Sequence, residues 1–92
     1  MFVVVAYDVA STRRRNKIVK ILKRHGQRVN YSVFECEFKK PEIFQSLKGD
    51  IEKMIKPNKD HIRYYAICQG CQKRIDVQGC DSIGRWKIVQ FA

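Results

Sequence analysis

The sequence contains no apolar stretch long enough to cross a membrane. Its most apolar run, FVVVAY at 2–7, is far shorter than the roughly 20 residues that span a bilayer. No cationic segment precedes this run, and Asp8 ends it, which is unlike a signal peptide. We therefore expect a cytoplasmic protein with no membrane partner. Its cysteines are then expected to be reduced thiols or metal ligands and not a disulfide framework.

Acidic residues are scarce. The 92-residue chain has 9 acidic and 19 basic residues, which gives a formal net charge of +10. A field of this sign attracts phosphates. No acidic residue occurs between Val9 and Phe34, so the basic residues there have no local partner that would support a helix, and phosphate binding is favoured over mere solvation. The basic residues of this segment are Arg13, Arg14, Arg15, Lys17, Lys20, Lys23, Arg24 and Arg28.

Hydrophobic periodicity predicts the first half of the fold. The run at 2–8 is typical of a strand buried on both faces. A helix follows, with Ser11 or Thr12 as its N-cap and Gly26 as its expected stop. Residues 28–39 alternate between apolar and polar side chains, which predicts either one long strand or two short strands bent near Ser32.

The second half repeats the pattern. Pro41 begins a second helix at the position that proline prefers, and residues 57–60 make a turn. The segments HIRYYAIC and RIDVQG are predicted as strands. This order predicts one α+β domain, a ferredoxin-like βαββαβ sandwich with an antiparallel sheet and two helices on one face. Residues 1–79 would form this core, and residues 80–92 an extension or extra strand that swaps onto a partner in a homodimer.

Asp8 stands between the most apolar segment and the arginines. From its position alone, two roles stay open: capping the strand-to-helix turn, and binding a hard cation. Mg²⁺ near phosphates is typically held by one or two carboxylates with water and substrate oxygens. If the first strand lies near a two-fold axis, the partner chain supplies a second Asp8, and the metal can activate water for phosphodiester hydrolysis. His25 and His61 are assigned to a helix end and a strand.

The cysteines and aromatic residues offer weaker alternatives. Cys68 and Cys71 form one CxxC pair without the second pair of a zinc ribbon, and a thiolate site would need Cys36 and Cys80 to converge on it. Four aromatic residues on predicted strands raise the possibility of base stacking, but SVFECEF is unlike the basic, glycine-containing motif of RNA-recognition modules, so packing is favoured. These four residues are Tyr31, Phe34, Tyr64 and Tyr65.

Several segments together resemble a known family. VVVAYDV, RRRNKIVKILKRHG, RVNYSVFECEF, and IRYYAIC followed by CQKRIDVQG are similar, in order and spacing, to the second universal CRISPR-associated (Cas) protein. The resemblance implies a ferredoxin-like homodimer in CRISPR spacer acquisition. It also implies an Mg²⁺-dependent endonuclease, with Mn²⁺ as the alternative cofactor, acting on RNA or DNA. The implied partners are the adaptation integrase and duplex DNA or single-stranded RNA.

The resemblance also implies site residues. Asp8 would bind the metal and face its mate across the dimer, with Tyr7 beside it. An arginine early in the first helix would be either Arg14 or Arg15. Other positions map onto the segment RVNYSVF: Arg28, Ser32 and Phe34. Three alternatives to catalysis in adaptation remain: a non-catalytic scaffold, a toxin-type ribonuclease of similar fold, and a binding module in which Asp8 is only a cap.

Overall fold

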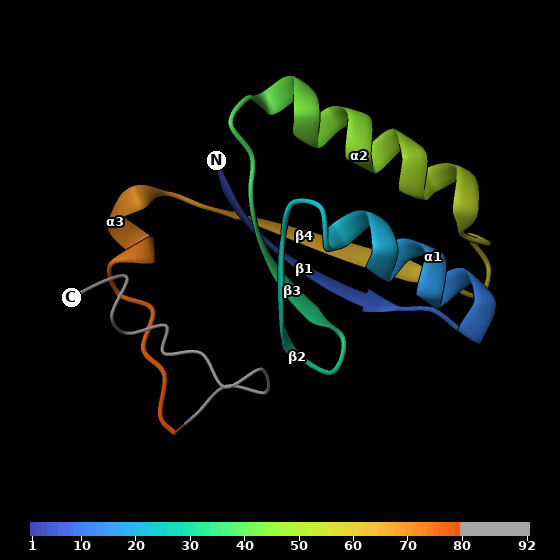
Figure 1. The fold of residues 1–92 in the computed structure, drawn as a ribbon, viewed down its shortest axis with the longest axis horizontal. Helices are drawn as coiled ribbons and strands as arrows, with labels where there is room; N and C mark the ends of the chain where they lie inside the picture. Colours follow the sequence, from blue (N-terminus) through green and yellow to red (C-terminus); the bar gives the residue numbers. More distant parts are fainter. Residues whose placement is uncertain (80–92) are drawn as a thin grey trace.

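The computed structural model describes residues 1–79, so the predicted extension at 80–92 lies outside the described residues. The strands form one antiparallel sheet in the order β2-β3-β1-β4. Both long helices, α1 and α2, lie on one side of this sheet (Figure 1). The predicted ferredoxin-like α+β fold is therefore confirmed. The elements in chain order are β1 (Phe2–Asp8), α1 (Thr12–Leu22), β2 (Gly26–Asn30), β3 (Val33–Glu37), α2 (Pro41–Met54), β4 (His61–Ile67) and α3 (Gln69–Gln72).

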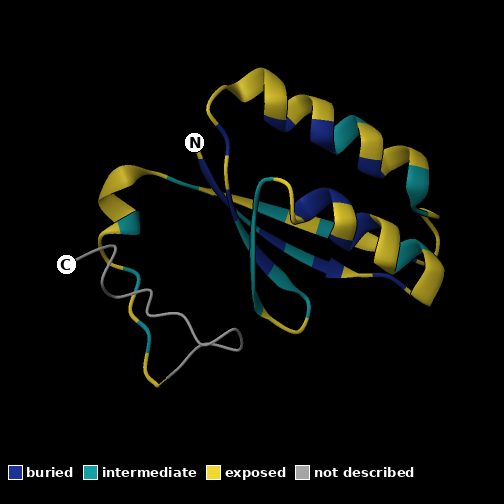
Figure 2. Ribbon diagram, in the orientation of Figure 1, coloured by how far each residue is buried: buried dark blue, intermediate teal, exposed yellow. Residues whose placement is uncertain are grey.

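The core lies between the sheet and the two helices. In β1, alternate residues point to opposite faces, so Val3, Val5 and Tyr7 are buried against the helices. Buried side chains of α1 and α2 complete this cluster, and the outer faces of both helices are exposed (Figure 2). We call the other side of the sheet, toward which Asp8 points, the open face. No helix among residues 1–79 is both long and apolar enough to span a bilayer.

Local signals fix where α1 and α2 begin. Ser11 is the N-cap of α1, and its hydroxyl oxygen accepts the Arg14 backbone N–H at 3.3 Å. Pro41 is the first residue of α2, where a missing N–H costs no hydrogen bond. Both helix starts therefore agree with the prediction.

Gly26 has a different role from the predicted one. The helix α1 ends at Leu22, and Gly26 begins β2 opposite Cys36. A Cβ at Gly26 would overlap the Glu35 carbonyl oxygen and lie 2.6 Å from the Cys36 Cα. Glycine is needed here because two strands approach closely, and not because it ends a helix.

Two further segments settle or correct the prediction. The stretch 28–39 forms two strands, β2 and β3, which turn at Tyr31 and Ser32. RIDVQG, predicted as a strand, contains none: the chain makes the short helix α3 directly after β4, and residues 75–78 are irregular. The Cys68 carbonyl accepts the Gln72 N–H at 2.9 Å, which turns the chain away from the sheet.

Candidate metal and nucleic-acid site

Asp8 lies at the carboxyl end of β1 with its side chain exposed. Because residues alternate along the strand, its carboxylate belongs to the open face of the sheet. In the antiparallel pairing of β1 with β4, Asp8 stands opposite His61, which is also exposed. The carboxylate is therefore accessible, and an imidazole is its cross-strand neighbour.

A hard-cation site at Asp8 would be incomplete in one chain. No group of three or more His, Cys, Asp or Glu side chains that could hold a metal occurs within residues 1–79. An exposed carboxylate is nevertheless the donor that Mg²⁺ prefers, and the ion usually keeps several waters and phosphate oxygens as its other ligands. The residue present thus fits one half of a shared Mg²⁺ site, and Asp8 is the residue that would hold the ion.

Tyr7 is buried behind Asp8 and supports the end of β1. Only 5% of its surface is exposed, and its phenolic O–H donates to the Tyr31 carbonyl at 3.2 Å. Its backbone N–H donates to the Ser32 carbonyl at 3.0 Å. The structure therefore brings Tyr7 and Ser32 together at the β2–β3 turn, on the opposite face from the Asp8 carboxylate.

Phe34 and Arg28 form a second part of this support. Phe34 is fully buried, with its ring centroid 6.1 Å from that of Tyr7, so it cannot stack on a nucleic-acid base. The Arg28 guanidinium lies 5.8 Å from the centroid of the Phe34 ring, in the cross-strand position. Its Nε is buried, with no hydrogen-bond partner within residues 1–79. The structure thus groups Arg28, Phe34 and Tyr7 on the helix side of the sheet, away from the carboxylate of Asp8.

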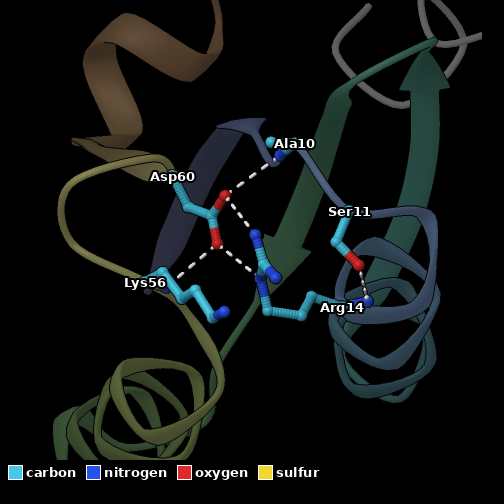
Figure 3. A network of polar contacts seen from close by, with 5 residues as sticks. All are labelled: Ala10, Ser11, Arg14, Lys56 and Asp60. Carbon is cyan, nitrogen blue, oxygen red and sulfur yellow. Dashed lines mark hydrogen bonds and ion pairs between the residues drawn. The ribbon is translucent and has the colours of Figure 1, made fainter.

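Asp60 belongs to the turn predicted at residues 57–60, and its local sequence does not indicate its role. The Asp60 side chain is fully buried and accepts four hydrogen bonds (Figure 3). Its Oδ1 accepts from the Ala10 N–H at 3.0 Å and from Arg14 Nη2 at 3.0 Å. Its Oδ2 accepts from Arg14 Nε at 2.8 Å and from the Lys56 N–H at 3.0 Å. One carboxylate therefore joins the loop after Asp8 to the first turn of α1 and the end of α2.

The pair is also an electrostatic unit. The hydrogen bonds from the Arg14 side chain, and then from the Lys56 backbone, hold the pKa of Asp60 well below its usual range. The same side-chain bond raises the pKa of Arg14. Arg14 thus remains charged, but its guanidinium is already paired with Asp60. The residues that flank Arg14 in the sequence do not indicate this partner.

The geometry distinguishes Arg14 from Arg15, whereas the sequence left the choice between them open. Arg15 is not engaged by Asp60; its Nη2 donates to Thr12 Oγ1 at 2.9 Å in an exposed bond. Exposed side chains on the same helix belong to Arg13, Lys17 and Lys20. Arg24 lies in the turn after α1 and lines a groove that also contains acidic residues. Arg15 is therefore the better placed of the pair for contact with a phosphate.

The three cysteines within residues 1–79 do not converge. Cys36 is buried in the core, where desolvation, with a smaller contribution from the charge of Glu35, raises the pKa of its thiol to about 11. Cys68 and Cys71 are exposed at α3, and Cys80 lies beyond the described residues. The pKa of Cys68 is lowered, chiefly by hydrogen bonds from Cys71. The described thiols therefore make no thiolate metal site of the type that the sequence left open.

A family comparison agrees with this geometry. The model of the family described as CRISPR associated protein Cas2 matches residues 1–75. The chain belongs to the Cas2 family. A relative from Chloroflexus aurantiacus, named CRISPR-associated endoribonuclease Cas2 1, is 38% identical over 80 residues, which is 86% of this chain and 85% of the relative. A Cas2 endoribonuclease from Synechocystis is 37% identical over 76 residues, 83% of this chain and 82% of the relative.

Solved structures show the same fold. The chain is similar to Streptococcus pyogenes Cas2, with a TM-score of 0.76 and 33% identity, over 86% of this chain and 100% of that one. It is also similar to a chain in a structure titled partial Cas6-RT-Cas1–Cas2 complex. That match has a TM-score of 0.70 and 30% identity, and covers 90% of this chain and 91% of the other. The Cas2 resemblance that the sequence motifs carried is therefore confirmed.

Proposed function

We propose that this chain is the Cas2 component of a CRISPR adaptation complex. It would act as a basic homodimer that binds nucleic acid together with the Cas1 integrase and hydrolyses phosphodiester bonds, with Mg²⁺ or alternatively Mn²⁺ held at Asp8. The observation that carries this proposal is the exposed Asp8 carboxylate, which ends a buried central strand directly before the cationic first turn of α1. The names of the Cas2 endoribonucleases and the Cas1–Cas2 structure support it.

Each site residue has a distinct task in this proposal. Asp8 holds the cation, which when bound lowers the pKa of a water and stabilises the leaving oxygen. Arg15 contacts the scissile phosphate, because its guanidinium matches the geometry of phosphate oxygens. Arg14 acts as a positioning residue through Asp60. Tyr7 and Phe34 stabilise the end of β1 by packing on the helix side of the sheet.

The open face supports the homodimer. Within residues 1–79, α1 and α2 cover only the other side of the sheet, so the open face has no helix layer. Val4 and Ala6 of β1 belong to this face, and Tyr65 of β4 is half exposed on it. A second copy packed here would cover these side chains and bring a second Asp8 to the site. Residues 80–92 would strengthen the pair as the swapped strand predicted from sequence.

The test is a cleavage assay with purified protein. End-labelled single-stranded RNA and duplex DNA are incubated with Mg²⁺ or EDTA, comparing the wild type with Asp8→Asn and measuring binding in the same samples. We expect metal-dependent cleavage that Asp8→Asn abolishes while nucleic-acid binding persists. Cleavage that survives in Asp8→Asn or in EDTA would contradict the assignment of Asp8 as the metal ligand.

One observation favours a second candidate function. Asp8 is a single carboxylate, and no cluster of three potential ligands accompanies it in the described part of the chain. The same protein without hydrolytic activity would be an architectural subunit that depends on its basic residues. Binding with no cleavage by either protein in the assay would establish this scaffold role. The family match over residues 1–75 supports either CRISPR role over a toxin-type ribonuclease.

A further inference from the structure

Cys68 and Cys71 form a thiol pair at the end of the sheet that is remote from Asp8. In the pairing of β1 with β4, Asp8 stands opposite the first residue of β4, whereas Phe2 stands opposite the last, Ile67. The six residue steps along β1 between these positions span about 20 Å of extended chain. Figure 1 accordingly shows α3 far from the first turn of α1. The thiol pair is thus separate from the candidate metal site.

One helical turn brings the two thiols together. The Cys68 carbonyl accepts the Gln72 N–H at 2.9 Å, which closes a turn around Cys71. Side chains three positions apart on such a turn are neighbours, and their Cα atoms lie within the range that a disulfide spans. A hydrogen bond between the two cysteine side chains places their sulfurs in contact. The pair can therefore close into a disulfide with little movement of the chain.

Both thiols of the pair are accessible. Cys68 and Cys71 are exposed, whereas Cys36 is buried in the core. Cys68 also lines a groove of about 450 Å³ between the start of β1 and the end of β4. Sites for small molecules have volumes of this size. A low-molecular-weight compound therefore has room beside the Cys68 sulfur.

The two exposed thiols are not equivalent. Hydrogen bonds from the Cys71 backbone N–H, and then from its side chain, lower the pKa of Cys68. The side-chain hydrogen bond and the charge of Cys68 raise the pKa of Cys71. The thiolate is the reactive form of cysteine, and at neutral pH it is therefore found at Cys68 more than at Cys71. The pair thus combines an attacking cysteine with a resolving one.

Metal binding is the competing interpretation of a CxxC pair. Two thiolates supply half of a tetrahedral zinc site, and no group of three or more potential metal ligands occurs within residues 1–79. A disulfide needs only the two sulfurs that already meet. In a protein whose thiols are expected to be reduced, an exposed CxxC is typical of reversible redox chemistry. The described residues therefore favour a disulfide over a metal.

We propose that Cys68 and Cys71 are a redox-active dithiol that reduces low-molecular-weight disulfides and is itself oxidised to an intramolecular disulfide. The Cys68 thiolate attacks one sulfur of the small disulfide, whose S–S bond breaks and releases one thiolate. Cys71 loses its proton and attacks the Cys68 sulfur, which forms the Cys68–Cys71 bond and releases the second thiolate. Two electrons pass to the small disulfide, and the two cysteine protons end, through water, on the released thiols. This activity goes beyond the proposed function and does not use Asp8.

The experiment uses glutathione as the small disulfide and follows the thiols by mass spectrometry. The 92-residue protein is equilibrated with oxidised and reduced glutathione, its free thiols are alkylated, and trypsin digestion follows without a reductant. Cys68 and Cys71 fall in one expected tryptic peptide, residues 64–73, and Cys36 and Cys80 fall in two others. The variants Cys68→Ser and Cys71→Ser are treated in the same way, and circular dichroism confirms that each is folded.

We expect the wild-type peptide 64–73 to escape alkylation and to become lighter by two hydrogen atoms, and dithiothreitol to reverse this change. The oxidised fraction should depend on the square of the reduced glutathione concentration, since two thiols are released for each disulfide formed. Buried Cys36 should stay reduced throughout and serves as the internal control.

The two serine variants test the order of attack. In Cys71→Ser a hydroxyl and the backbone N–H still donate to Cys68, so the first step should proceed and stop at a mixed disulfide with glutathione. Cys68→Ser should form its mixed disulfide severalfold more slowly at pH 7, because the remaining thiol lacks the hydrogen bonds that lower the pKa of Cys68. Equal rates in the two variants would contradict the assignment of Cys68 as the attacking thiol.

Three results would overturn the proposal as a whole. One is glutathione attached to both cysteines of the wild type, because the two sulfurs would then fail to meet. The second is a pair that stays reduced in excess oxidised glutathione. The third is protection of both thiols from alkylation by one equivalent of Zn²⁺, which would identify a metal site. Asp8→Asn should be oxidised as the wild type is, and a loss of oxidation in that variant would contradict the separation of the two sites.

Discussion

Asp60 fixes the loop that follows Asp8. Its carboxylate is fully buried and joins the Ala10 N–H, the Arg14 side chain and the Lys56 N–H. Breaking a buried ion pair from one side leaves the other charge uncompensated. We therefore expect Asp60→Asn to lower the melting temperature at neutral pH by several degrees, measured by circular dichroism, while Asp50→Asn, an exposed position on α2, leaves it nearly unchanged.

The same pair has a defined pH dependence. The pKa of Asp60 is depressed in the folded chain, so its contribution is fully present above the ordinary aspartate pKa of about 4 and is lost as pH falls below it. The difference in melting temperature between wild type and Asp60→Asn should therefore be largest near neutral pH and shrink below about pH 4. A difference that stays constant, or grows, on acidification would show that the charge of Asp60 does not stabilise the fold.

At the scale of elements, the β2–β3 hairpin depends on Gly26. A methyl group there would overlap backbone atoms of β3, which cannot move aside as a flexible side chain could. We expect Gly26→Ala to destabilise the protein by about 1–3 kcal/mol in urea unfolding. Gly49 in α2 is the matched control: a Cβ meets nothing within 4 Å, and alanine should stabilise the helix by about 0.5–1 kcal/mol. Equal effects at both glycines would contradict this account.

The sequence predicts elements whose signals are local. Period-two alternation, the Ser11 cap and Pro41 each act within a few residues, so β1, α1, α2 and β4 were found where expected. The Arg14–Asp60 pair joins positions 46 apart, and no nearby residue marks Asp60 as buried. Gly26 likewise depends on a strand that passes it only in the folded chain. The place of Asp8 at the end of the first strand followed from the apolar run, but its exposure and its neighbour His61 required the folded sheet.

At the scale of the whole molecule, the open face determines whether the candidate site is complete. Tyr65 is 49% exposed on this face in one chain, so a charge there costs the isolated fold little but would be buried between two copies. We expect Tyr65→Glu to convert the protein from twice the mass of one chain to a single chain in sedimentation equilibrium. Metal-dependent cleavage should fall with the loss of the second Asp8, by at least tenfold.

Tyr31→Glu is the control for this dimer prediction, because Tyr31 is 84% exposed in the β2–β3 turn and the substitution adds the same charge. This variant should keep the mass and the cleavage rate of the wild type. Both variants lower the positive charge equally, so any loss of activity common to them reports weaker nucleic-acid binding. Only a loss confined to Tyr65→Glu identifies the shared metal site. If Tyr65→Glu sediments as the wild type does, the second copy packs on another surface. The metal site would then have only the single Asp8 carboxylate of one chain.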